Sequence, residues 1–273
     1  MRSVLSNLTY LELTDDYLKT DPIQLMAKHG KSFYFASMIF SKARLIRIAT
    51  LYRLCRFIDD CADELPEEES KHAINSIIYD LNHKEHKTKF NQLVSQVEKW
   101  GINRQDLEEL VRGAEFDAQG GKILTRADLT LYCYRVAGVV GLMMCPLIGV
   151  TDKRGYPHAI DLGLGMQLTN ICRDILEDAR MKRVYIPEVD INGRGLTLKD
   201  LQQDKTPLEL RELVKNLLAK ADEYYTSGKN GLAYIPFRPR VVILLAGEIY
   251  RHIGVKIKKN NYQVLAGRTY LTF

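Results

Sequence analysis

Apolar residues recur every three or four positions through most of this chain, and this spacing restricts the folds that it can adopt. A helix turns once in 3.6 residues, so the pattern gives each segment one apolar face. Strict alternation of apolar and polar residues, which is typical of a half-buried strand, is scarce over strand length. We therefore predict an all-α protein. The predicted helices cover residues 22–38, 43–63, 67–82, 89–100, 104–116, 127–149, 158–176, 208–229 and 239–260.

The breaks between these helices are local. Helix-breaking residues occur at Gly120-Gly121, at 151–155 and at Gly193-Arg194-Gly195. None of these segments has the composition of a linker, and no repeat of solenoid length is present. The chain has 273 residues, a length that one large domain can accommodate. We predict a single helical domain over residues 1–273.

Composition excludes several classes of protein. With 46% hydrophobic and 27% charged residues, the chain matches an ordinary globular protein. Its net charge of +5 is modest and its Lys and Arg form no dense run, so we expect no nucleic-acid binding. The longest uncharged run, 136–151, is shorter than the roughly 20 residues of a membrane-spanning helix.

The termini and cysteines point to one compartment. The N-terminus lacks the apolar block and cleavage site of a secretory signal. The five cysteines include no CxxC pair and lie in apolar helical patterns, which favours reduced, buried thiols. We expect a cytoplasmic protein, since structural disulfides are rare there.

One predicted helix, 43–63, carries an acidic face. Its residues at i, i+4, i+7 and i+11 are Tyr52, Arg56, Asp59 and Asp63. This spacing places the four side chains on one side of the helix, while most of the remaining positions are apolar. The two carboxylates therefore face the same neighbour, which is either a ligand or another part of the protein.

A second helix, 158–176 with its C-terminal extension, repeats the arrangement. Gln167, Asn170, Asp174 and Asp178 lie at i, i+3, i+7 and i+11. Clustered carboxylates repel each other and are costly to desolvate, so they require compensating cations.

Hard oxygen ligands favour Mg²⁺, which shares its coordination between carboxylates and a ligand's phosphates. Arg56 and Arg173 supply positive groups suited to phosphate oxygens. Surface salt bridges at exposed helix ends are the simpler alternative, but two matching stripes favour a metal and diphosphate site.

Several longer motifs carry a resemblance to a known family. They are HGKSFYFA at 29–36, CRFIDDCAD at 55–63, YCYRVAGVVGLMM at 132–144 and LG-x3-Q-x2-N-x2-RD-x3-D at 162–178, followed by RVYIP at 183–187. Through them the chain resembles the squalene/phytoene synthase family, and within it the bacterial phytoene synthases. The resemblance extends from about residue 28 to residue 268.

The resemblance implies an isoprenoid-synthase-type helical bundle around a central cavity. It also implies head-to-head (C1′-1) condensation of two geranylgeranyl diphosphates, through a cyclopropyl diphosphate, to phytoene. The implied cofactor is Mg²⁺, with Mn²⁺ as a substitute and no need for NADPH. The implied partners are prenyl diphosphate substrates and, for release of an apolar product, peripheral contact with a membrane.

The resemblance also assigns roles to residues of this chain. The metal ligands would be Asp59, Asp63, Asn170, Asp174 and Asp178. The four aspartates would also be catalytic, with Tyr132 orienting diphosphate or relaying a proton. The substrate-binding residues would be His29, Ser32, Tyr52, Arg56, Gln167, Arg173 and Tyr250.

Three alternatives stay open. The same fold could form squalene or dehydrosqualene from farnesyl diphosphate, and the squalene reaction uses NADPH. Asp59-Asp60-x-x-Asp63 also matches the motif of head-to-tail prenyl diphosphate synthases, although the second motif of that class is missing. A non-catalytic assembly protein on the same fold should have lost the acidic stripes, which are intact here.

Overall fold

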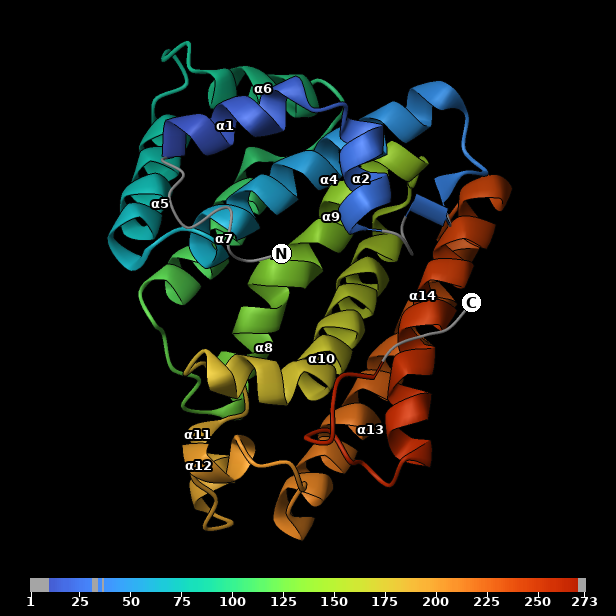
Figure 1. Cartoon of the computed structure of the whole chain (residues 1–273). Coiled ribbons are helices and arrows are strands. Elements are labelled where there is room, and N and C mark those ends of the chain that lie inside the picture. The colour runs from blue at the N-terminus through green and yellow to red at the C-terminus, as the bar shows by residue number, and fades with distance from the viewer. Residues whose placement is uncertain (1–9, 31–33, 36, 270–273) are drawn as a thin grey trace.

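The computed structural model describes residues 10–30, 34–35 and 37–269, with side chains for all of these except 11–13 (Figure 1). The regular elements in these ranges are all helical, which confirms the predicted all-α class. The α-helices are α1 (Tyr10–Lys19), α2 (Pro22–His29), α4 (Lys42–Asp63), α5 (Glu67–Asn82), α6 (Lys89–Glu98), α7 (Arg104–Ala118), α8 (Arg126–Cys133), α9 (Val139–Ile148), α10 (Tyr156–Arg180), α11 (Glu188–Asn192), α12 (Leu198–Leu201), α13 (Leu208–Gly231) and α14 (Phe237–Lys259).

Long helices with a clear apolar period were predicted best. The predicted helix 67–82 has the bounds of α5, and 43–63 differs from α4 by one residue. The predicted helix 22–38 is interrupted after His29, because α2 ends there at Gly30, whose backbone has left the helical conformation. Among the described residues that follow, Tyr34, Phe35 and Ser37 are helical again, and Met38 lies in a turn. The predicted helix 127–149 contains a π-helical turn, Tyr134–Gly138, between α8 and α9. The short helices α1, α11 and α12 were not predicted.

Polar residues that precede helices have different roles. Asp21 caps α2, since its side chain accepts hydrogen bonds from the backbone of Ile23 and Gln24. Thr206 does not cap α13. Its hydroxyl instead accepts the backbone N–H groups of Val264 and Leu265, at 3.0 and 3.1 Å. Thr206 therefore holds the chain that follows α14.

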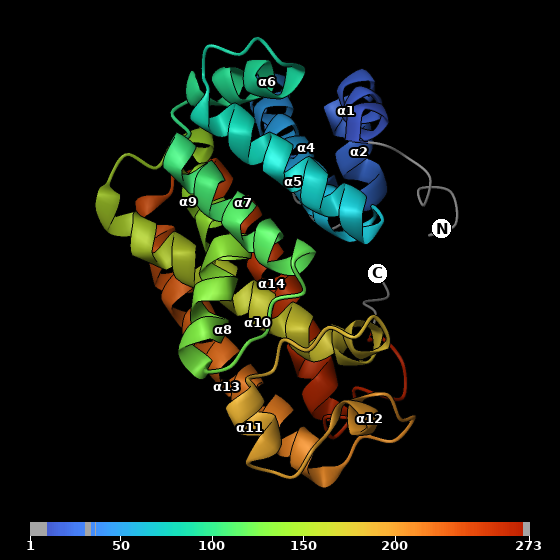
Figure 2. The same cartoon turned by 90° about the vertical axis from the view of Figure 1, so that its left-hand side faces the viewer.

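Two glycines allow α10 to pack closely against the helices before it. A Cβ at Gly163 would lie 2.4 Å from the carbonyl oxygen of Ala137, and one at Gly141 would lie 2.2 Å from that of Ala159. No side chain fits at either contact. On its other side α10 packs along α13 and α14, and Figure 2 shows α10 within the bundle.

The stretch Arg126–Ile148, which comprises α8, the π-helical turn and α9, is long and apolar enough to cross a membrane by length and composition alone. This stretch is 23 residues long because it includes charged residues near its start. The prediction from the sequence considered only the uncharged run 136–151 and therefore underestimated the length of the apolar helix. The stretch packs against α7 and α10, and part of it lines a cavity. These contacts account for its apolar composition in this fold.

All five cysteines are free thiols. Cys61, Cys133, Cys145 and Cys172 are buried, as the sequence predicted. Cys55 is half-buried because it faces the cavity.

Candidate active site

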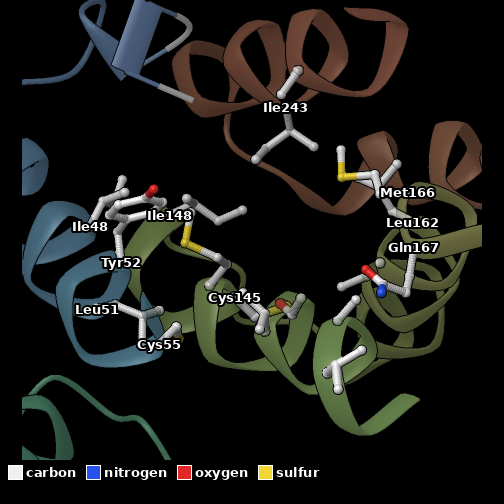
Figure 3. Close-up of a pocket in the computed structure, with 18 of the residues that line it drawn as sticks. Ile48, Leu51, Tyr52, Cys55, Cys145, Ile148, Leu162, Met166, Gln167 and Ile243 are labelled. Atoms are coloured by element: carbon white, nitrogen blue, oxygen red, sulfur yellow. The ribbon is translucent and has the colours of Figure 1, made fainter. Parts of the chain in front are cut away.

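A cavity of about 380 Å³ lies between α4, α9, α10 and α14. Figure 3 shows its apolar wall, which includes Ile48, Leu51, Ile148, Leu162 and Ile243. Polar residues gather toward one end of the cavity. They are Tyr52, Arg56, Asp59, Asp117, Gln167, Asn170 and Tyr250. The cavity therefore suits a molecule with a long apolar part and a polar, charged head.

The periodicity of two helices creates this polarity. On α4, the cavity wall runs from Ile48 to Ala62, which are separated by about 21 Å of helix at 1.5 Å per residue, and Asp59 lies one turn before its end. On α10, Leu162, Met166 and Asn170 follow each other at four-residue intervals along the opposite wall. Most of the oxygen-bearing cavity residues of both helices thus lie in their C-terminal halves of the cavity wall, while apolar residues predominate before them.

The three aspartates of the α4 motif have different surroundings. Asp59 faces the cavity, and 58% of its side-chain surface is exposed. The protein around it nevertheless displaces bulk water, which raises its pKa, and Asp63 raises that pKa further. Asp63 forms an ion pair with Arg183. Asp60 points away from the cavity: it is buried, accepts a hydrogen bond from Tyr17 and lies 2.5 Å from Arg56.

On α10, Asp174 is held between two arginines. Arg173 lies 2.5 Å from it, and Arg268 lies 3.0 Å from it. Arg268 also pairs with Glu177 at 3.2 Å. Asp174 is therefore neutralised by one residue of its own helix and by one from the chain after α14.

Asp178 connects the two acidic helices electrostatically. Burial raises its pKa to about 7, Asp174 and Asp63 raise it too, and Arg183 opposes the shift. Asp63 belongs to α4 and Asp178 to α10, so the ends of these two helices lie near each other with Arg183 between them. Asp63, Asp174 and Asp178 lie beyond the cavity lining, next to its polar end.

A third carboxylate reaches the polar end from α7. Asp117 accepts hydrogen bonds from Tyr132, at 2.9 Å, and Tyr185, at 2.7 Å. The two tyrosine rings stack with their centroids 4.8 Å apart. Burial raises the pKa of Asp117 to about 6. Asp117 lines the cavity, whereas Tyr132 is buried behind it.

The remaining predicted residues divide into two groups. Tyr52, Arg56, Gln167 and Tyr250 line the cavity, as Figure 3 shows for Tyr52 and Gln167. Others do not reach the cavity lining or lie outside the described ranges. Arg173 is held by Asp174, His29 is exposed in the last turn of α2, and Ser32 lies outside the described residues. Partial burial lowers the pKa of His29, and nearby Arg56 lowers it further.

The oxygen atoms of these residues are suitable ligands for a divalent cation, but in this structure they are not grouped around a common point. Asn170 Oδ1 is buried at the cavity wall and has no hydrogen-bond partner in the described part of the chain. In that same part, no three His, Cys, Asp or Glu side chains lie close enough to share one ion. Arg183 and Arg268 pair with the carboxylates instead. Metal binding would therefore require these two arginines to move.

Sequence reasoning gave no role to Arg183, Arg268 or Tyr185. Arg183 and Tyr185 lie in the RVYIP motif at 183–187, and their place in that motif could have identified them as site residues. Nothing local marks Arg268, because its partner Asp174 lies 94 positions earlier.

Comparisons with known proteins agree with this geometry. A family model of squalene/phytoene synthases matches residues 26–273. The 15-cis-phytoene synthase of Pantoea ananas is 32% identical over 255 residues, which are 88% of this chain and 82% of that protein. The 15-cis-phytoene synthase of Enterobacter agglomerans is 34% identical over 241 residues, covering 84% and 82%.

Solved structures show the same architecture. A dehydrosqualene synthase in complex with a ligand matches with a TM-score of 0.81 and 27% identity, over 93% of this chain and 90% of that one. A squalene synthase from Alicyclobacillus acidocaldarius matches with a TM-score of 0.79 and 20% identity, over 93% and 97%. The predicted isoprenoid-synthase fold is thereby confirmed. With its motifs, its cavity and a family match over nearly the whole length, the chain belongs to the squalene/phytoene synthase family of prenyltransferases.

Proposed function

We propose that this protein condenses two geranylgeranyl diphosphates head to head, through a cyclopropyl diphosphate, and releases phytoene and diphosphate. The observation that carries the proposal is the polarity of the cavity, which is apolar over most of its length and ends between two acidic helices. A prenyl diphosphate has the same polarity. The C20 substrate rests on the likeness to two 15-cis-phytoene synthases.

The arginines and oxygen-bearing residues at the polar end would bind the diphosphate groups. Asp59, Asp63, Asn170, Asp174 and Asp178 would hold Mg²⁺, which when bound neutralises the departing diphosphate. Arg56, Arg173 and Arg183 would bind its oxygens as their carboxylate partners turn to the metal.

The apolar wall protects the reacting carbon atoms. Loss of diphosphate from the first substrate leaves an allylic cation, and Leu162 and Met166 keep water away from it. The double bond of the second substrate attacks this cation, and loss of a proton from the attacked carbon closes the ring of the cyclopropyl diphosphate. A second ionisation, rearrangement and proton loss then give the linear triene. Released diphosphate is the proposed base, while Tyr132 and Tyr185 fix Asp117 at the wall.

One observation favours a second candidate. The dehydrosqualene synthase structure matches this chain with a TM-score of 0.81, and dehydrosqualene is a C30 product rather than phytoene. The same site would then join two C15 farnesyl diphosphates, with or without an NADPH-dependent reduction.

Product analysis tests these proposals directly. Purified protein with Mg²⁺, or with Mn²⁺, should convert geranylgeranyl diphosphate to phytoene without NADPH. A preference for farnesyl diphosphate would support the C30 reaction, and a longer linear diphosphate would indicate head-to-tail chemistry. Asp63→Ala and Asp174→Ala should abolish the product without changing the helical circular dichroism spectrum. No product from any of these substrates would refute the enzymatic proposal.

A further inference from the structure

A second cavity, of about 300 Å³, lies between α13 and α14. The proposed function gives it no role, and we call it the side pocket to distinguish it from the main cavity. Leu162, Gly228 and Ile243 line both cavities. A single layer of residues, which we call the dividing wall, therefore separates the side pocket from the space proposed for the substrates.

Leu162 fills the dividing wall. A Cβ on Gly228 of α13 would lie 2.9 Å from Leu162 Cβ, and a Cβ on Gly247 of α14 would lie 3.4 Å from Leu162 Cδ1. Leu162 of α10 is therefore inserted between two helices that carry no side chain at the contact. Figure 3 shows Leu162 together with Ile243, which completes the dividing wall from α14.

Hydrogen bonds next to the dividing wall fix α10 against α13. Ser227, the residue before Gly228, donates its hydroxyl proton to the carboxylate of Asp161, the residue before Leu162. Because that proton is used, Ser227 Oγ accepts a hydrogen bond from His158 Nδ1, at 2.8 Å. The reaction proposed above uses none of these polar groups. Their place beside the contact of Leu162 with Gly228 indicates that they hold Leu162 in register.

The dividing wall lies partway along the path of a prenyl chain. Leu162 precedes Asn170 on α10 by eight residues, which is about 12 Å of helix at 1.5 Å per residue. A prenyl chain whose diphosphate is held at the polar end would therefore pass Leu162 with its distal isoprene units. These are the units that distinguish a longer substrate from a shorter one.

The side pocket has apolar surface for such units. Leu232 and Leu244 line it, in addition to the residues that it shares with the main cavity. Its charged residues Lys229 and Glu248 are exposed, so they can stay in water while hydrocarbon occupies the inner part. The side pocket is thus space that a prenyl chain could use and that Leu162 closes.

We propose that Leu162 is a specificity-determining residue, which closes the side pocket and thereby limits the length of the prenyl chain that the main cavity accepts. Without its side chain the two cavities would join, and the distal units of a longer chain would enter the side pocket. The apolar surface buried there would favour the longer substrate. The inference rests on the proposed function for its substrate class, the prenyl diphosphates.

Binding of unreactive analogues tests the dividing wall. Prenyl thiolodiphosphates of 15, 20 and 25 carbons ionise very slowly, so their dissociation constants, measured by calorimetry with Mg²⁺, report fit alone. Leu162→Ala should raise the affinity for the C25 analogue relative to the C20 analogue by about tenfold or more. Gly228→Ala should favour the C15 analogue over the C20 analogue, because its methyl group would push Leu162 toward the main cavity.

Leu168→Ala is the matched control. Leu168 lies on the same helix, is buried and lines neither cavity. Its truncation should cost stability and leave the C25 to C20 affinity ratio unchanged. If Leu162→Ala does not fold, Leu162→Val carries the same test and should shift the ratio less, in the same direction.

Product analysis separates this inference from the proposed function. Given geranylgeranyl and geranylfarnesyl diphosphates together, Leu162→Ala should incorporate more of the C25 substrate than the unaltered protein does. The expected shift in analogue binding without any hydrocarbon product would refute the function and leave the role of Leu162 standing. An unchanged affinity ratio in folded Leu162→Ala would refute that role. So would an equal shift in Leu168→Ala, since it would show a general loosening of the core.

Discussion

The two acidic helices carry aspartates in related spacings but balance their charges differently. On α4, Asp59 faces the open cavity and Asp63 is paired with Arg183, which comes from the chain after α10. On α10, Asp174 is paired with its neighbour Arg173 and with Arg268. Spacing therefore identifies which side chains share a face, but their charge balance depends on arginines supplied from elsewhere in the chain.

The comparison also separates an acid that faces the cavity from a structural one. Asp59 and Asp60 are adjacent, yet Asp59 faces the cavity while Asp60 is 3% exposed and bonded to Tyr17. The double-aspartate motif thus combines one carboxylate that faces the cavity with one that links α1 to α4.

The largest expected effect is the loss of activity when an aspartate of either acidic helix is replaced. Asp63→Asn and Asp178→Asn should each lower turnover by about 100-fold or more, because each removes a ligand charge without changing side-chain size. A strong loss on one helix and none on the other would contradict the idea that both walls bind diphosphate through metal.

The Asp178→Asn variant should also differ from the unaltered protein in stability, by an amount that depends on pH. The pKa of Asp178 is raised to about 7 from 3.8, so the folded protein holds this proton more tightly than the unfolded chain does. Its contribution to stability is therefore lost as pH rises from about 4 to about 7. Without metal, Asp178→Asn should have a higher Tm than the unaltered protein at pH 7, and the difference should disappear near pH 4.

The second effect distinguishes the adjacent aspartates. Asp60→Ala should lower the free energy of unfolding by about 1–3 kcal/mol, because it leaves Tyr17 and Arg56 without a buried acceptor. Asp59→Ala should change that free energy by less than about 0.5 kcal/mol while removing activity. Urea unfolding of both variants is the measurement, and equal losses of stability would show that the two carboxylates have the same role.

The third effect concerns the arginines that pair with each helix. Arg183→Met should destabilise the metal-free protein by about 1–3 kcal/mol, because it leaves Asp63 unpaired near Asp178. Mg²⁺ should restore much of this stability. Arg268→Met should cost less, since Arg173 still pairs with Asp174. Thermal unfolding with and without Mg²⁺ measures both, and the reverse order would overturn the assignment.

The smallest effect is expected for the two tyrosines that donate hydrogen bonds to Asp117. Tyr132→Phe and Tyr185→Phe each remove one hydrogen bond to this carboxylate, which should cost about 0.5–1.5 kcal/mol of stability and reduce turnover only a few-fold. A far larger loss of turnover in Tyr132→Phe alone would show that Tyr132 relays a proton rather than positioning Asp117.

The sequence predicted what depends on local periodicity. The bounds of α5, the bounds of α4 within one residue and the cavity face of α4 follow from the 3.6-residue turn. Pairings between distant segments could not be predicted in this way. Arg183 and Asp63 are 120 positions apart, and only the folded chain brings them together.

Other features escaped prediction for energetic reasons. The π-helical turn Tyr134–Gly138 adds one residue to a turn of an otherwise regular apolar helix, and its single glycine, Gly138, does not distinguish it in the sequence from a regular helical turn. α1 is short, so it depends on contacts such as that of Tyr17 with Asp60 rather than on its own helical hydrogen bonds.

The hydroxyl of Thr206 fastens Val264 and Leu265, and Arg268 reaches Asp174 only a few residues later. The last described stretch of chain is thus held at two points, the hydroxyl of Thr206 and the carboxylates at the end of α10. Because none of these contacts is a hydrogen bond within a long helix, the stretch can open locally, and leave Asp174 with one arginine, while the bundle stays folded.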